Sequence, residues 1–469
     1  MAHAPTPDST LTSQVVQFIC TTPWEAVPTA VRQEAKRCWL DGLAVMVAGS
    51  TEPCSLILQR YLQGLGTPGR STVIGTSMTT HAELAALANG VSGHALDYDD
   101  TQLASHPSRV YGLLTHPTVP VLAAALALGQ ELAANGQAVL HAFCIGFEVE
   151  CKLAETIHPR HYQQGFHSTG TFGTFGAAAV GAVLLGLNPE QTRMALGIAA
   201  SKASGIRANF GTMTKPYHAG AAAQNGLIAA RLASLGFTAD PNALDGPWGY
   251  FQVAGGGADP QFLTGKLGSP WAILDPGVSV KPYPCGSLLH PAMDTLRDLV
   301  LEHDLRPQQV AKIRLGTTSN VLSALRYARP QNALQAKFSI PFMLGILVLR
   351  RQAGLQEFRD EVVQSREVQD FLSKVEAYLD PELEALGFAR IRARVEVHLN
   401  DGRILSRMAE VSRGTPQRPL SHRDLMEKFQ DCARGVLPPQ QVEAVAQKVD
   451  SVETLADINT LMALLHPRT

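Results

Sequence analysis

The stretch STGTFGTFGAAAVGAVLLGLN, residues 168–188, decides how most of this chain folds. It carries no charged residue and consists largely of Gly, Ala and Thr, with few large apolar side chains. A membrane span needs about 20 predominantly apolar residues, and one isolated span would be unusual in such a chain. The composition instead predicts a buried helix that neighbouring helices approach closely.

Helical patterning extends well beyond this stretch. Apolar residues recur at helical spacing from Val15 to about Phe251, and no convincing strand pattern occurs there. Asn188-Pro189 is typical of a helix start, because Pro at a first helical position gives up a hydrogen bond that would be missing anyway. These features predict helices joined by short connections, for example over residues 30–47, 82–91, 119–132, 171–187 and 219–235.

A second region follows Gly255-Gly256-Gly257, where the composition shifts toward Gly and Pro. Residues 312–317 alternate weakly and residues 391–399 alternate clearly between apolar and polar side chains, which is typical of half-buried strands. Asn400-Asp401-Gly402 can turn the chain back into a partner strand over residues 404–411. This region is therefore expected to be α+β. From Ser421 onward the pattern is helical again, and that tail could pack back on the first region.

Composition excludes several classes of protein. Hydrophobic residues make up 45% and charged residues 17%, so much of the chain must lie in a core. The net charge of -2 provides no global field for nucleic acid or an anionic membrane. The 7 cysteines are scattered without a C-x-x-C pair, which argues against a zinc ribbon or an iron–sulfur centre. The polar start does not resemble a signal peptide, so we expect a cytoplasmic protein.

Nucleotide-binding and zinc-protease motifs are missing from the sequence, and candidate chemistry rests on His, Lys and Asp residues near helix ends. One cluster is HALDYDDT, residues 94–101, in which Asp97, Asp99 and Asp100 follow His94 closely. Three carboxylates within four residues repel one another, so a purpose is plausible. Helix capping beside a polar loop would explain them, and a magnesium site is the alternative, although no second acidic cluster completes its ligand shell.

Three histidines stand at junctions. His106 and His116 each precede Pro, but only His116 leads directly into an apolar helix, where the helix dipole would lower its pKa. His167 also precedes an apolar helix, and the small hydroxyl residues and backbone N–H groups after it suit an anion. A capping histidine or a core histidine with a structural partner is the alternative for each position.

Two lysines stand at comparable places. Lys215 precedes a run of Ala and Gly too small to shield it, so it could reach an interior pocket as a carboxylate anchor or as an acid/base. The alternative is a lysine that extends from a helix end to solvent. Lys281, with His290 nearby, follows the composition change, where two domains would meet and ligand clefts are common. An ordinary Pro-rich linker would also explain this segment.

These segments together resemble the MmgE/PrpD family, which includes 2-methylcitrate dehydratase, cis-aconitate decarboxylase and iminodisuccinate epimerase. The resemblance covers nearly the whole chain, and several long motifs in family order make it specific. They are HALDYDDT at 94–101, THPTVPVLAA at 115–124, GFHSTGTFGTFGAAA at 165–179, NFGTMTKPYHAGAAAQNG at 209–226, KPYPCG at 281–286, and RYARP with AKFS within 326–339.

The resemblance implies a mainly α fold. A large helical domain, residues 1–270, would be completed by residues 413–469, and a smaller α+β lid domain, residues 271–412, would be inserted before the C-terminal helices. It also implies a homodimer, a small polycarboxylate substrate held between domain and lid, and no metal or organic cofactor. Neither a nucleic acid nor a membrane is expected as a partner.

Carried over by position, the resemblance assigns a pocket to this chain. The catalytic residues would be His116, His167, Lys215 and Asp97, and the substrate-binding residues would be Thr101, Lys281 and Tyr327. Two further candidates for binding are His290, the histidine nearest after Lys281, and His106, whose His-Pro-Ser matches equally well as a bare tripeptide. His116 fits the family pattern better than His106, because the apolar helix follows it. After Lys281 the chain departs from the decarboxylase pattern: Gly286 stands where that branch has a His, which puts decarboxylation in doubt.

The chemistry of these residues supports the same class. Abstraction of a proton next to a carboxylate places charge on the carboxylate oxygens, which lysines and N–H donors can stabilise, while a neutral His or an Asp takes the proton. We therefore expect a cofactor-independent lyase, most simply a hydratase or dehydratase such as one for a 2-methylcitrate-like acid. The alternatives are an epimerase or racemase of an iminodisuccinate-like acid, a cis-aconitate-type decarboxylase, a magnesium-dependent helical enzyme, and a catalytically silent scaffold.

Overall fold

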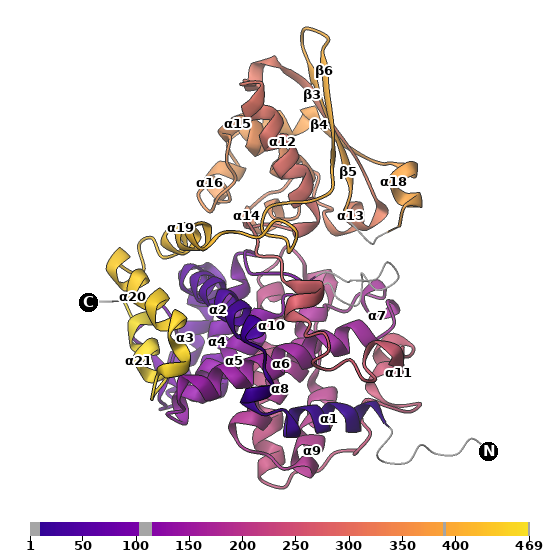
Figure 1. Ribbon diagram of the computed structural model, residues 1–469. Coiled ribbons are helices and arrows are strands. Elements are labelled where there is room, and N and C mark those ends of the chain that lie inside the picture. The colour runs from indigo at the N-terminus through magenta and orange to yellow at the C-terminus, as the bar shows by residue number, and fades with distance from the viewer. Residues whose placement is uncertain (1–9, 103–114, 388–390, 468–469) are drawn as a thin grey trace, which may run out of the picture.

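The computed structural model describes residues 10–102, 115–387 and 391–467 and shows a mainly α protein in two parts, as predicted (Figure 1). The helical part contains α1 (Leu11–Thr21), α2 (Thr29–Gly49), α3 (Pro53–Leu65), α4 (Ala82–Ala95), α5 (Thr118–Glu131), α6 (Gly136–Thr156), α7 (Arg160–Gln163), α8 (Ser168–Leu184), α9 (Pro189–Lys202), α10 (Thr214–Ser234) and α11 (Tyr250–Gly255). The C-terminal helices α19 (His422–Cys432), α20 (Pro439–Asp450) and α21 (Asn459–Met462) complete it.

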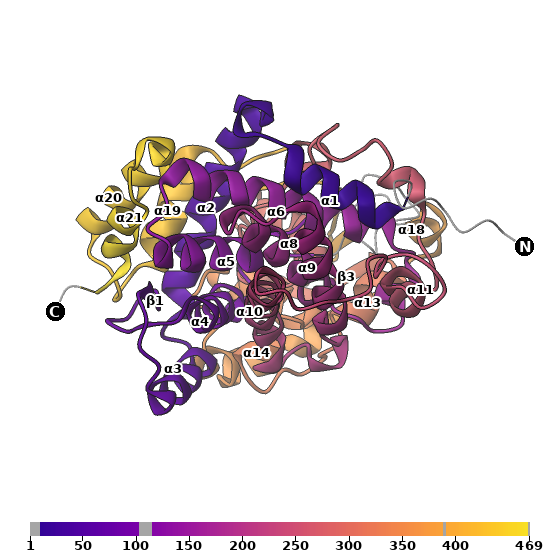
Figure 2. The same ribbon diagram turned by 90° about the horizontal axis from the view of Figure 1, so that it is seen from below.

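Helix α8 lies at the centre of the helical part, beside α6, α9 and α10 (Figure 2). It is buried continuously from Ser168 to Ala182, which confirms the buried helix predicted from its small, uncharged residues. Pro189 begins α9, and Asn188 caps it in a capping box with Gln191. Within the described residues, no helix combines the length and the apolar character that crossing a membrane requires.

Glycines set the spacing between α4 and α10. A Cβ atom added to Gly90 would lie 2.6 Å from Cα of Gly220, and one added to Gly220 would lie 2.3 Å from the carbonyl oxygen of Leu87. The two backbones are therefore nearly in contact. This close crossing brings the last turn of α4 to the first turn of α10, where the candidate residues His94 and Lys215 lie.

The α+β part holds helices α12 (His290–Glu302), α13 (Ser319–Ala324), α14 (Ala333–Ala336), α15 (Ile340–Arg350), α16 (Asp360–Val363), α17 (Arg366–Phe371) and α18 (Pro381–Ala385). Its four strands, β3 (Val310–Thr317), β4 (Val375–Leu379), β5 (Ala393–Leu399) and β6 (Ile404–Ala409), pair in the order β4-β3-β5-β6. Strands β5 and β6 form the predicted antiparallel hairpin. Helices α12 and α15 contact each other and the sheet.

Two details of strand structure differ from the sequence predictions. Strand β4 pairs parallel to β3 and was not predicted, because its residues are mostly half exposed and lack the alternation that reveals β5. The region predicted to lack strands contains β1 (Ser71–Thr72) and β2 (Thr79–Thr80). A pair of two-residue strands is too short to leave a periodic pattern.

The chain leaves the helical part and returns to it. One hydrophobic core combines residues 11–280 with residues 420–465, and a second core combines residues 283–409 with Phe210. Helix α19 packs on α2, and α21 packs on α5, so the C-terminal tail does pack back on the first region. The first core reaches Val280, past the predicted limit at residue 270.

The Gly220 contact leads to a stability prediction. Replacing Gly220 with Ala forces a methyl group against the Leu87 carbonyl group, and overpacking of this kind costs about 1–3 kcal/mol. Gly64→Ala is the matched control, because Gly64 lies within α3 and a Cβ there meets nothing within 4 Å. Thermal unfolding followed by circular dichroism should show a lower midpoint for Gly220→Ala and an equal or higher one for Gly64→Ala. Equal midpoints in both variants would refute the close crossing.

Candidate active site

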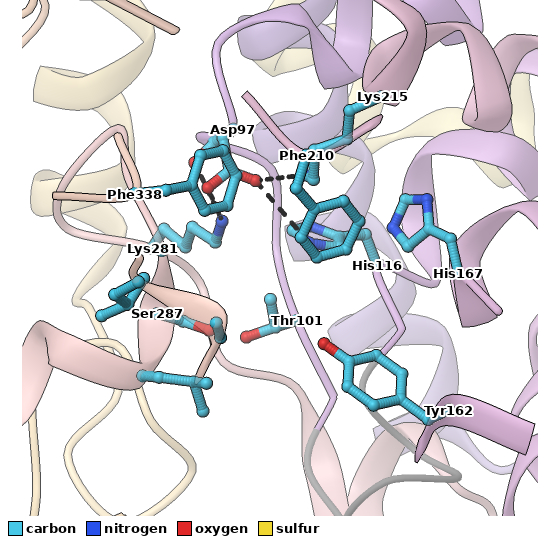
Figure 3. Close-up of a pocket in the computed structure, with 14 residues that line it drawn as sticks. Asp97, Thr101, His116, Tyr162, His167, Phe210, Lys215, Lys281, Ser287 and Phe338 are labelled. Carbon is cyan, nitrogen blue, oxygen red and sulfur yellow. Dashed lines mark hydrogen bonds and ion pairs between the residues drawn. The ribbon is translucent and has the colours of Figure 1, made fainter. Parts of the chain in front are cut away.

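A pocket lies where the helical part meets the α+β part (Figure 3). Its volume is about 50 Å³, and its lining combines ionisable side chains with apolar ones. The lining residues are Asp97, Thr101, His116, Tyr162, His167, Phe210, Lys215, Lys281, Gly286, Ser287, Leu288, Ala324, Leu325 and Phe338. Most of the residues assigned from the sequence are therefore brought together from distant segments.

Asp97 is the centre of the ionisable group. It follows the end of α4 in the left-handed region, with φ 51°, a conformation that Asp tolerates better than most residues. Lys215 Nζ donates to its Oδ1 at 2.5 Å, and Lys281 Nζ lies 3.1 Å from its Oδ2 (Figure 3). Lys281 also donates to the Asp97 carbonyl group at 2.9 Å. One buried carboxylate thus joins two buried ammonium groups.

A second network links Asp99 to two histidines. Its Oδ2 lies 2.8 Å from Nδ1 of His94 and 3.2 Å from Nδ1 of His116. A carboxylate at this position favours the N–H on Nδ1 of each ring, which leaves Nε2 free to accept a proton. Nε2 of His94 accepts from Lys215 at 2.9 Å. For His116, the same logic leaves a basic nitrogen at the pocket.

His167 immediately precedes α8 and pairs with another histidine. Its Nδ1 lies 3.0 Å from Nδ1 of His218, so one ring donates and the other accepts. The His167 ring also packs edge-on against Phe210, with centroids 4.9 Å apart. Its position before a buried helix agrees with the sequence analysis, while its partner His218 was not predicted.

Burial and the neighbouring charges fix the protonation states. Burial lowers the pKa of His116, and the cations of Lys281 and Lys215 act in the same direction against the Asp99 carboxylate. Burial also takes the pKa of His167 well below its usual value. Burial alone would raise the pKa of Asp97, but Lys215 and Lys281 hold it well below its ordinary range. The pocket therefore combines an ionised carboxylate with neutral imidazoles.

His116 lies just before α5, and its pKa is lowered, both as predicted. The largest cause of the lowered pKa is burial. Asp100 performs the capping role instead: Thr118 donates to it through its backbone N–H at 3.3 Å and through its hydroxyl at 2.5 Å. Helix capping, left open for the acidic cluster, thus accounts for Asp100 but not for Asp97 or Asp99.

Two further buried lysines hold the segment that carries Asp97. Lys337 of the α+β part donates to the Leu96 carbonyl at 2.7 Å, and burial lowers its pKa to about 8. Lys428 of α19 donates to the Tyr98 carbonyl at 2.8 Å and pairs with Asp41 of α2 at 2.6 Å. The site segment is therefore anchored on both sides of Asp97, which sequence reasoning did not detect.

The acidic cluster also has the composition of a metal site. His94, Asp97, Asp99 and His116 each offer a ligand atom within 4.8 Å of the others. The Lys215 ammonium, however, already contacts Asp97 Oδ1 and His94 Nε2, two of the atoms that a cation would need. A metal ion and this ammonium would compete for the same oxygen and nitrogen, so the geometry favours a site built on lysine.

Other predicted residues lie farther out. Tyr327 is half-buried, donates to the Phe210 carbonyl at 2.9 Å and does not line the pocket. His290 lines a neighbouring cleft of about 440 Å³ that shares Thr101, Lys281 and Ser287 with the pocket. Its ring lies 3.2 Å from the Cys285 carbonyl oxygen. His106 lies outside the described residues.

The apolar lining was not predicted either. Phe210 and Phe338 stack with centroids 5.6 Å apart, and Lys215 Nζ lies 5.5 Å from each ring. Both rings fall within motifs quoted for the family, NFGT and AKFS, but no spacing rule shows which apolar residue of a motif faces a pocket.

Comparisons with known proteins all point to the MmgE/PrpD family. The model of the MmgE/PrpD N-terminal domain matches residues 13–263, and that of the MmgE/PrpD C-terminal domain matches residues 283–453. The chain is 30% identical over 445 residues to cis-aconitate decarboxylase of Homo sapiens, covering 93% of this chain and 90% of that protein. It is 26% identical to cis-aconitate decarboxylase of Aspergillus terreus, over 98% and 96% of the two chains. A 2-methylcitrate dehydratase of Escherichia coli K12 is 24% identical over 75% and 74%.

The protonation state of His116 gives a testable prediction. Because burial disfavours the imidazolium form, its titration midpoint should lie below the ordinary value of about 6.5. Nitrogen-15 NMR of labelled histidines should show neutral His116 with the proton on Nδ1 at pH 7. Asp99→Asn removes the charge that opposes this shift, so it should move the midpoint to still lower pH. A midpoint at or above 6.5 in the unaltered protein would contradict the account.

Proposed function

Because the chain belongs to the MmgE/PrpD family, we propose that this lyase removes a proton next to a carboxylate of a small di- or tricarboxylate and eliminates water. The observation that carries the proposal is the pair of buried lysines on Asp97 beside a neutral imidazole, His116. This arrangement supplies both things the reaction needs. Fixed cations stabilise the charge that develops on the substrate carboxylate, and the imidazole accepts the proton.

The lysines keep donors available for substrate. An ammonium group has three N–H donors. Lys215 directs two of its donors to Asp97 and His94. Lys281 directs two of its donors to Asp97, one to the backbone carbonyl group and one to the side-chain carboxylate. Since both side chains line the pocket, each has a remaining donor for a substrate carboxylate. Asp97 thus orients the two cations for binding rather than acting as the base.

The two histidines have different roles. His116 is the base, since Asp99 favours the tautomer with a free Nε2. His167, neutral and paired with His218, hydrogen-bonds the departing hydroxyl group, which takes up the proton that His116 has accepted and leaves as water. Neither step needs a cofactor. Thr101, whose hydroxyl has no hydrogen-bond partner among the described residues, is placed to bind a substrate oxygen.

Decarboxylation is the second candidate, and the similarity to decarboxylases from Homo sapiens and Aspergillus terreus favours it. The lysine pair would serve it equally, because carbon dioxide loss also leaves charge that a fixed cation can stabilise. Against it stands Gly286 at the pocket wall, a position without a side chain to donate a proton.

The product distinguishes the two reactions. Candidate acids are screened for binding by thermal shift, and those that bind are followed by proton NMR in D2O. We expect loss of a hydroxyl group to form an unsaturated acid, with deuterium exchange at the carbon next to a carboxylate. Release of carbon dioxide with retention of the double bond would establish decarboxylation, and exchange with inversion alone would establish an epimerase. Absence of all three reactions would contradict the proposal.

Lys215 should be essential for transition-state stabilisation. Lys215→Met keeps the side-chain volume but removes the cation, and the loss should amount to about 2–4 kcal/mol in kcat/KM. Lys152→Met is the matched control: Lys152 is 3% exposed, against 4% for Lys215, and lines neither cavity. A change of less than about threefold for Lys215→Met would remove Lys215 from the site.

The histidines can be separated by substitution. His116→Asn and His167→Asn should each lower kcat by about 10²-fold or more, because the first removes the general base and the second removes a hydrogen-bond donor to the leaving group. His106→Asn should lower it little, as expected from the sequence. In D2O, only the residue that abstracts the proton should control deuterium exchange, so His116→Asn should abolish exchange. If His106→Asn abolished exchange and His116→Asn did not, the assignment of the first histidine would be wrong.

We also propose that the protein is a homodimer located in the cytoplasm. The cysteines are all unpaired, which suits a reducing compartment. Helix α3 exposes Leu56, Ile57, Tyr61 and Leu65, apolar side chains that a second copy of the chain would cover. Light scattering that gives the mass of one chain would contradict the dimer.

A further inference from the structure

The pocket has two chemically different sides. The helical part and the segment around Lys281 supply the charged and imidazole groups described above. The α+β part supplies an apolar wall, which we define as Leu288, Ala324, Leu325 and Phe338. Between them, Gly286 adds no side chain and Ser287 adds one hydroxyl group. Among the described lining residues, the α+β part therefore offers no cation to a ligand.

The charges available to a ligand are limited. The two ammonium groups of Lys215 and Lys281 face the carboxylates of Asp97 and Asp99, so with neutral imidazoles these four groups sum to zero. Each lysine has one donor left for the ligand. Two remaining ammonium donors suit two carboxylates, and a third carboxylate would meet no cation of its own in the described lining.

Further cations near the pocket are already engaged. Lys337 donates to the Leu96 and Pro284 carbonyl groups, at 2.7 and 3.1 Å. Arg413 lines the adjoining cleft, but its backbone N–H and its guanidinium both donate to Asp294, at 2.6 and 3.2 Å. It also donates to the hydroxyl of Tyr283 at 3.2 Å. Its charge is therefore neutralised within the α+β part.

We propose that the substrate is a dicarboxylate whose remaining substituent is uncharged and apolar and packs against the wall of Leu288, Ala324, Leu325 and Phe338. This inference rests on the proposed function and narrows its substrate class. A carboxylate pressed against this wall would lose its hydration without gaining a partner, which is costly. An alkyl group in the same place would instead bury apolar surface on both sides, which is favourable.

The dimensions of the pocket agree with a compact substituent. The cavity of about 50 Å³ is far smaller than the roughly 300–1,000 Å³ of ordinary ligand sites. A Cβ atom added to Gly286 would lie 2.6 Å from Cδ2 of Leu325, so even one carbon at that position would press on the wall.

Three acids test the substituent directly. Malate, 2-ethylmalate and citrate share one dicarboxylate core and differ at a single carbon, which carries hydrogen, ethyl or carboxymethyl. We expect kcat/KM for 2-ethylmalate to exceed that for citrate by about tenfold or more, the scale on which a pocket discriminates such groups. Calorimetry should likewise show tighter binding, that is a smaller dissociation constant, for 2-ethylmalate than for citrate.

A substitution at Leu325 tests whether the apolar character of the wall selects the substituent. Leu325→Lys adds an ammonium group to the wall and should shift the ratio of kcat/KM at least tenfold toward citrate, while Leu325→Met, of similar length but uncharged, should not. If the Leu325→Lys protein does not fold, the comparison in the unaltered protein decides the question.

The outcomes separate this inference from the proposed function. Preferential turnover of citrate by the unaltered protein, or an unchanged ratio in folded Leu325→Lys, overturns the apolar substituent and leaves the lyase proposal intact. Neither binding, turnover nor deuterium exchange with any of these acids overturns both.

Discussion

The ion pairs of Asp97 with Lys215 and Lys281 are the constraint on which the rest of the structure depends. All three residues are at least 96% buried, and charges removed from water in this way are costly unless each is paired. Together they connect the end of α4, the start of α10 and the segment where the chain crosses toward the α+β part. Loss of one partner would leave a buried charge uncompensated, so the cluster fixes these segments relative to one another.

The helical architecture makes this cluster possible. Gly90 and Gly220 let α4 and α10 approach until their backbones nearly touch, which places His94 and Lys215 within hydrogen-bonding distance. Lys337 and Lys428 then hold the backbone on either side of Asp97. The neutral histidines follow from the same burial, since the low-dielectric surroundings that strengthen the ion pairs also disfavour imidazolium. The burial of the site thus explains both the paired positions of the two lysines and the neutral state of the histidines.

Much of this arrangement can be predicted from the sequence, for identifiable reasons. Long periodic segments such as α8 and the alternating strand β5 leave clear patterns, and the motifs around Asp97, His116 and Lys215 mark the site. The partners Asp99, His218 and Lys428 could not be assigned, because their roles depend on contacts between segments far apart in the chain. For His290 the sequence gives proximity to Lys281, but the first turn of α12 directs the ring to the neighbouring cleft.

The central claim is that the two lysines bind substrate carboxylates while His116 faces the proton to be removed. A crystal structure with succinate, a dicarboxylate that has no hydroxyl group to lose, tests it most directly. The account predicts carboxylate oxygens within hydrogen-bonding distance of Nζ of both Lys215 and Lys281, with Nε2 of His116 facing a methylene carbon. Succinate bound in the adjoining cleft at Arg413, with the Asp97 cluster unoccupied, would contradict it.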